Sequence, residues 1–162
     1  MSWWRKQRAP LLALLLTVIS AAGVHLWLDV LPSSEADVPT VVEAERRGEI
    51  AGQRIAVDAV RWDEFDAPAG SRTVSVLLDA TGGKDATTCG AFTLSEVDGP
   101  RVWLDAGGEL NVPSDAGERS CLEESLSYDI FVVFLVPDDA MGPFHLDIPD
   151  RDGRILRFVV EP

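Results

Sequence analysis

One uncharged stretch near the N-terminus constrains this chain more than any other feature of its sequence. Residues 9–28 contain no Asp, Glu, Lys or Arg, and the basic residues Arg5, Lys6 and Arg8 precede them. A run of this length can cross a bilayer as a helix. Because basic residues favour the cytoplasmic side of a membrane, we expect a single-pass protein of the cell membrane, with its N-terminus in the cytoplasm and its C-terminal part outside.

This reading predicts four parts along the chain. They are a cytoplasmic basic tail (1–8), a transmembrane anchor or uncleaved signal (9–31), a linker with a possible edge element (32–49) and an extracytoplasmic β-sandwich domain (50–162). The alternative is a cleaved signal peptide, because the small residues Ser20-Ala21-Ala22 suit a signal peptidase. The apolar character continues past Ala22 to Leu28, which favours a retained anchor.

The part after residue 31 is strongly acidic. It holds 11 basic and 26 acidic residues, which gives a net charge of −15. Nucleic acids and anionic lipid headgroups attract basic surfaces, so this balance argues against both as partners. Its length is that of one ordinary domain.

Two cysteines, Cys89 and Cys121, lie in the part that we place outside the cytoplasm. Disulfides form in that environment, and neither cysteine belongs to a CxxC motif or directly adjoins a basic residue. We therefore predict a structural disulfide between them.

Alternation of apolar and polar residues with a period of two predicts short strands through most of this domain. We expect strands at residues 53–62, 73–80, 92–94, 102–104, 128–136, 144–148 and 154–160. Residues 130–136 are continuously apolar, which is typical of a central strand buried on both faces, or of one twisted across two sheets. The pattern predicts an all-β fold, an immunoglobulin-like antiparallel β-sandwich preceded by one transmembrane helix, with a small barrel as the alternative.

The segment before these strands is ambiguous. Thr40 and Glu43 have the spacing of a capping box, which favours a turn or two of helix. Val41 and Val42, followed by Gly48, equally suit a short edge strand. Propensity leaves both structures open.

Two short motifs resemble those of a known family. Residues 92–99 read FTLSEVDG and residues 134–140 read FLVPDDA. They resemble bacterial immunoglobulin-like (telokin-like) domains of unknown function on membrane-anchored and lipoprotein chains, in which a Leu-x-x-x-Asp-Gly hairpin precedes a strand ending in Val-Pro-x-x-Ala. The resemblance extends over residues 50–162 at most, and it implies a surface binding or structural module.

The sequence offers no recognisable set of catalytic or cofactor-binding residues. His145 is the only histidine after the apolar stretch, and no Ser stands in a Gly-x-Ser-x-Gly elbow. We therefore expect no enzyme activity and no cofactor.

Acidic loops provide the only candidates for a metal site. Asp150 and Asp152, in the sequence Asp-Arg-Asp-Gly, resemble the opening of a calcium loop, but no further acidic ligand follows them, so a β-turn is favoured. Other acidic groups lie at residues 63–66, 123–124 and 138–139. They would form a calcium site only if two of these loops met.

The leading functional hypothesis is a membrane-anchored domain that binds another cell-envelope protein outside the cytoplasm. Trp62 and Trp103 are aromatic candidates for its binding face, although an indole more often lies in a core. The alternatives are an extracytoplasmic ligand or calcium sensor, and a secreted protein released by cleavage near Ala22.

Overall fold

The computed structural model describes residues 3–25 and 39–162. The chain divides into two compact units, Met1–Val38 and Pro39–Pro162. The described part of the first unit is one helix, α1, which spans Trp3–His25. In the ranges that the structure describes, no helix combines the length and the apolar character that crossing a bilayer requires.

The predicted transmembrane span over residues 9–31 is therefore not supported by the structure. The structure describes residues 9–25 of this span, and all of them lie in α1. Residues 26–31 of the predicted span, and residues 32–38 of the predicted linker, lie outside the described residues.

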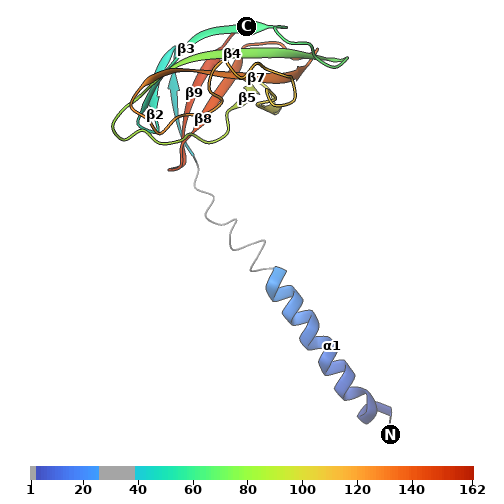
Figure 1. Cartoon of the computed structure of the whole chain (residues 1–162). Helices are drawn as coiled ribbons and strands as arrows, with labels where there is room; N and C mark the ends of the chain where they lie inside the picture. The colour runs from blue at the N-terminus through green and yellow to red at the C-terminus, as the bar shows by residue number, and fades with distance from the viewer. Residues whose placement is uncertain (1–2, 26–38) are drawn as a thin grey trace. The chain divides into compact units, whose positions relative to one another are not determined.

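The second unit consists of strands that form two layers (Figure 1). The strands are β1 Thr40–Ala44, β2 Arg47–Ile50, β3 Gln53–Trp62, β4 Ser71–Gly82, β5 Thr93–Glu96, β6 Val102–Leu104, β7 Ser127–Pro137, β8 Phe144–Pro149 and β9 Arg154–Val160. Sheet A has the order β1-β9-β8-β5-β6, and sheet B has the order β2-β3-β4-β7. The predicted β-sandwich is confirmed, and this unit also includes residues 39–49, which the sequence assigned to a linker and possible edge element.

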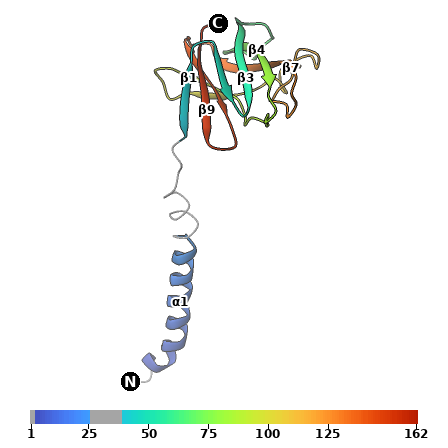
Figure 2. The same cartoon turned by 90° about the vertical axis from the view of Figure 1, so that its left-hand side faces the viewer.

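Residues 40–44 form an edge strand, which settles the ambiguity between helix and strand. β1 pairs with β9 in parallel, with Val41 opposite Ile155, whereas the other strand pairs are antiparallel. Figure 2 shows β1 beside β9. The chain then crosses to sheet B, where the Val57 amide donates to the Arg46 carbonyl at 2.9 Å.

Alternating side chains of the two sheets fill the core. Phe134 of β7, together with Phe144 of β8 and Phe158 of β9, is fully buried there. Trp62 and Trp103 flank Phe144, each with its ring centroid 5.8 Å from that of Phe144 in an edge-on arrangement. Both indoles are partly buried against the core.

Strand β7 lies at the end of sheet B, so the prediction of a central strand was wrong. Its free edge is covered by residues 105–118, which form bridges from Asp105 to Phe134 and from Glu118 to Ile130. Val133, on the outer face, is fully buried. The long apolar run is therefore explained by a covering loop and not by strands on both sides.

The predicted disulfide between Cys89 and Cys121 is present. It joins the loop before β5 to the segment before β7. Gln53 fixes the same two segments, because its Nε2 donates to the carbonyls of Thr87 at 2.9 Å and Leu122 at 2.8 Å. Its Oε1 accepts from the Tyr128 hydroxyl.

Replacing Cys89 with Ser should lower the free energy of unfolding by about 3 to 4 kcal/mol, because the bridge no longer closes a loop of 32 residues in the unfolded chain. Urea denaturation measures this loss. The double variant Cys89→Ser/Cys121→Ser is the control and should lose about as much, since the two cysteines share one bond. A loss below about 1 kcal/mol, which is an ordinary surface effect, would contradict the expectation.

Candidate binding surface

The outer face of sheet A carries several exposed apolar side chains. On β9, Leu156, Phe158 and Val160 point into the core, so the residues between them point outward. The register extends this alternation to the neighbouring strands. The outward residues, which we call the sheet A face, are Val41, Glu43, Thr93, Ser95, Val102, Leu104, His145, Asp147, Pro149, Ile155, Arg157 and Val159.

Exposed apolar side chains occupy both margins of the sheet A face. Val102 and Leu104 on β6 are 59% and 65% exposed, and Val159 and Val41 on the other side are 52% and 39% exposed. β6 consists of three apolar residues, and a strand can direct only alternate ones into the core. Trp103 takes the inward position, which leaves Val102 and Leu104 in solvent.

The outer edge of β6 is only partly open among the described residues, because the bridge from Asp105 to Phe134 joins the residue after Leu104 to β7. Trp103 is opposite Leu94 of β5, and the Glu96 amide donates to the Arg101 carbonyl at 3.2 Å. Because hydrogen-bonded pairs alternate along an antiparallel ladder, the backbone groups of Val102 and Leu104 point away from β5. The edge can therefore accept a further segment only at its Val102 end, since the Ala106 amide donates to the Val133 carbonyl at 2.7 Å beside Leu104.

An ion pair lies between the two apolar margins. Arg157 of β9 donates through Nε and Nη2 to the two carboxylate oxygens of Asp147 on β8, both at 2.7 Å. The side chains are only 25% and 14% exposed. The hydrogen bonds to Asp147 raise the pKa of Arg157, and its Nη1 group has no partner among the described contacts. The sheet A face thus presents the Nη1 group of Arg157 as a hydrogen-bond donor whose orientation is fixed by the ion pair.

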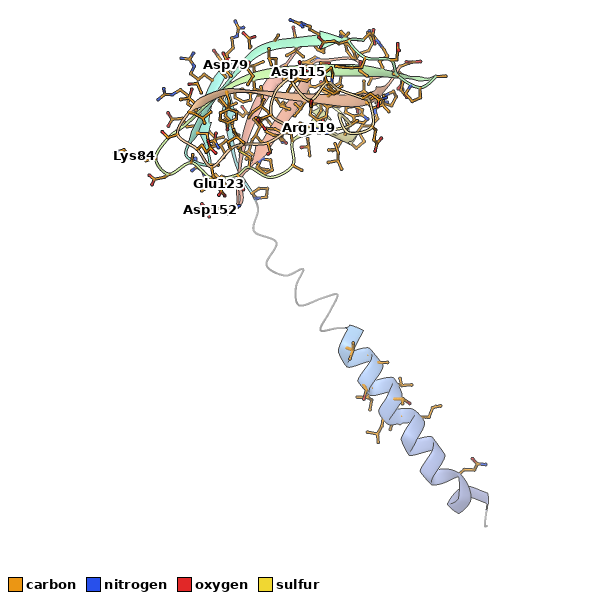
Figure 3. The ribbon with its side chains drawn as sticks, viewed as in Figure 1. Asp79, Lys84, Asp115, Arg119, Glu123 and Asp152 are labelled. Atoms are coloured by element: carbon orange, nitrogen blue, oxygen red, sulfur yellow. A yellow bond between two sulfur atoms is a disulfide. The ribbon has the colours of Figure 1, made fainter. Side chains whose placement is uncertain are left out.

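Asp150 and Asp152, the predicted metal candidates, belong to a hydrogen-bonded turn. Asp150 Oδ1 accepts from the amides of Asp152 at 2.9 Å and Arg154 at 2.8 Å. Arg151 pairs with Glu123 at 3.3 Å, and Figure 3 shows Glu123 and Asp152 at the same end of the domain. The described residues contain no group of three or more His, Cys, Asp or Glu that could hold a metal ion.

Two of the acidic loops do meet at the end of the sandwich, but arginines lie between their carboxylates. The amide of Asp138 donates to the carbonyl of Gly70, next to the loop that carries Asp63. Arg72 pairs with Asp63 at 2.6 Å. Its hydrogen bond lowers the pKa of Asp63. The arrangement thus neutralises acidic charge within the protein.

Arg101 has the same role at the β5–β6 hairpin. It contacts Glu96 at 2.5 Å and Asp139 at 2.8 Å. Its hydrogen bond lowers the pKa of Glu96, and the two acidic partners raise the pKa of Arg101. This ion-pair group ties the hairpin to the β7–β8 loop.

The aromatic candidates and the histidine are distributed differently. Trp62 and Trp103 contact the core, and guanidinium groups lie over their rings, Arg72 at 4.2 Å and Arg101 at 5.8 Å from the ring centroids. His145 lies on the sheet A face, between Ser95 and Val159 in the register. The structure therefore brings the histidine, but neither tryptophan, to the open face.

A solved β-sandwich structure is similar to this chain. It is an uncharacterized protein from Clostridium difficile 630, with 11% sequence identity and a TM-score of 0.47 over 76% of this chain and 95% of that chain. No protein-family model and no curated protein matches the chain. The strand order itself establishes the β-sandwich, and these comparisons do not support the resemblance to telokin-like domains.

The Glu96 ion pair predicts a pH dependence. Because Arg101 lowers the pKa of Glu96, the folded state keeps this charge at a pH where the unfolded chain takes up a proton. The resulting stability is present above the ordinary pKa of 4.5 and is lost as the pH falls through the lower pKa of the folded state. Glu96→Gln should therefore make urea stability less dependent on pH below about pH 4.5.

Asp98→Asn provides the matched control, because Asp98 is an exposed acid in the same hairpin turn and has no ion pair among the described contacts. We expect this control to keep the acid-side slope of the unmodified protein. An unchanged slope in Glu96→Gln would contradict the assignment.

Proposed function

We propose that residues 39–162 form a non-catalytic binding module, and that the sheet A face docks another protein of the cell envelope. The exposure of the apolar side chains of Val102 and Leu104 on β6 is the observation that carries this proposal. Contiguous apolar surface bordered by polar groups is typical of protein interaction sites. The part of the β6 edge at Val102 that is not joined to β7 adds main-chain hydrogen bonds as a source of affinity.

The chemistry of the face favours an extended polypeptide segment as the occupant. Its backbone would approach β6 at Val102, and its side chains would cover Val102 and Leu104. The half-buried Arg157 would donate from Nη1 to a carbonyl or carboxylate of the partner. Because its pairing with Asp147 already fixes the guanidinium, little side-chain freedom is lost on binding.

The immunoglobulin-like assignment is also part of this proposal. Strands β3, β4 and β7 have the neighbours expected of strands A, B and E, and β5, β6, β8 and β9 those of C, C′, F and G. The disulfide differs from the B–F bridge of antibody domains, since it joins two loops. The strand order supports an immunoglobulin-like fold, whereas the positions of the cysteines do not contribute to this assignment.

A photo-crosslinking residue in place of Leu104 tests the docking surface in intact cells. We expect one reproducible adduct with an envelope protein from position 104, and loss of that adduct when Val102→Glu is added, because a buried carboxylate in the interface would lack a partner. Mass spectrometry identifies the captured protein.

The matched control places the crosslinker at Leu126, an exposed leucine before β7. This position should capture no defined partner. Equal capture from positions 104 and 126, or capture at 104 that survives Val102→Glu, would refute docking on the sheet A face.

We further propose that the chain is held in the membrane, with residues 1–8 in the cytoplasm. The uncharged residues 9–28 behind Arg5, Lys6 and Arg8 support this localisation. Cell fractionation should recover the protein at full mass in the membrane fraction. A variant lacking residues 1–31 should lose this association.

Two outcomes would contradict the anchor. A mature protein in the medium that begins after Ala22 would establish secretion by signal cleavage. Recovery of the full-length protein in the cytosolic fraction would show that the domain is not exported.

A further inference from the structure

A groove lined by arginines runs over the outer face of sheet B and continues to the β2–β3 turn at the end of the sandwich, where Arg154 of β9 in sheet A also lines it. Three adjoining hollows of about 420, 340 and 400 Å³ form it. The first and second share Arg54 and Thr81, and the second and third share Arg47, Ala56 and Asp79. The residues used below to define this arginine groove are Arg46, Arg47, Arg54, Ala56, Asp79, Thr81 and Arg154.

The register explains why the surface is hollow there. Ala56 of β3 lies between Arg47 of β2 and Asp79 of β4. Its short side chain forms a floor between two long ones. Arg54 lies two residues along β3 and opposite Thr81, so the groove follows the direction of the strands.

The arginines of the groove are distinguished by their lack of acidic partners. In residues 39–162, which hold 11 basic and 24 acidic residues, most arginines pair with a carboxylate. The paired ones are Arg54, Arg61, Arg72, Arg101, Arg119, Arg151 and Arg157. Among the described residues, Arg46, Arg47 and Arg154 have no ion pair, and all three line the groove. Arg54 has only a 3.4 Å contact with Glu49.

We propose that the arginine groove binds an acidic, extended segment of a partner polypeptide, independently of the sheet A face. Alternate side chains of an extended segment lie about 7 Å apart, which is also the spacing of Arg54 and Ala56 along β3. Carboxylates at alternate positions would therefore reach Arg54 and then Arg47 beside Ala56. Arginine guanidinium groups bind carboxylates with paired hydrogen bonds.

The acidic residues of the groove argue for a peptide over a continuous polyanion. Asp79, which Figure 3 labels, is exposed across Ala56 from Arg47. Asp58 lies at one end of the groove, and Glu49 lines the other end beside Arg54. A phosphate backbone or an anionic membrane presents negative charge at every position and would meet these carboxylates. A peptide can place a neutral or basic residue opposite Asp79.

The test measures binding of a rhodamine-labelled peptide of alternating Glu and Thr to the full-length protein in detergent, by fluorescence anisotropy. We expect the variant Arg46→Gln/Arg47→Gln to weaken binding at least tenfold, equal to about 1.4 kcal/mol. The variant Arg154→Gln should also weaken it. Added salt should weaken binding to the unmodified protein, because the contacts are exposed.

The matched control is Arg61→Gln/Arg151→Gln, which removes the same charge from exposed arginines outside the groove. It should change the affinity less than twofold, and a peptide of alternating Gln and Thr should not bind. If both double variants weaken binding equally, the affinity depends on the total charge of the protein and not on the groove. That result would overturn the proposed site. Binding to phosphatidylserine vesicles without binding to the acidic peptide would overturn the assigned partner. Urea denaturation establishes that each variant is folded.

Discussion

The hydrogen bonds of Gln53 hold together the part of the domain that strand pairing leaves loose. Two long segments, residues 83–92 and 105–126, connect strands of different sheets. A buried amide side chain bonded to Thr87, Leu122 and Tyr128 gives both segments a fixed position, and the disulfide closes the same junction covalently. Because an unpaired buried amide is costly, Gln53 defines the positions of both segments as well as adding stability.

The sequence predicts the strands well because each has a clear period of two, and it predicts the disulfide because two cysteines occur in a domain expected to be exported. The position of β7 could not be predicted in this way. A continuous apolar run indicates burial on both faces, but it does not reveal whether strands or a loop provide the cover. Here residues 105–118 provide it, through bridges that join residues far apart in sequence.

The two proposed binding surfaces were less accessible to sequence analysis than the strands. Val102-Trp103-Leu104 carries a signal that could have been used, since three successive apolar residues in a strand place at least one outside the core unless other parts of the protein cover the outer face. The pairing of Arg157 with Asp147 also follows from a tight turn at residues 150–153, because the hairpin register places these residues opposite each other. The arginine groove carries no comparable signal. The groove depends on which arginines lack an ion pair with a carboxylate, and only the folded structure determines those pairs.

The parallel pairing of β1 with β9 has a mechanical consequence. Five residue pairs connect the first strand of the domain to its last, and the preceding chain enters at Thr40. Tension applied to Thr40 in the direction of the strand would run along β1, at right angles to the hydrogen bonds between the two strands. Such a load is shared by all five pairs at once, whereas a load across the strands would open them one after another. A domain attached in this way can transmit a pull to sheet A while its first strand stays in place.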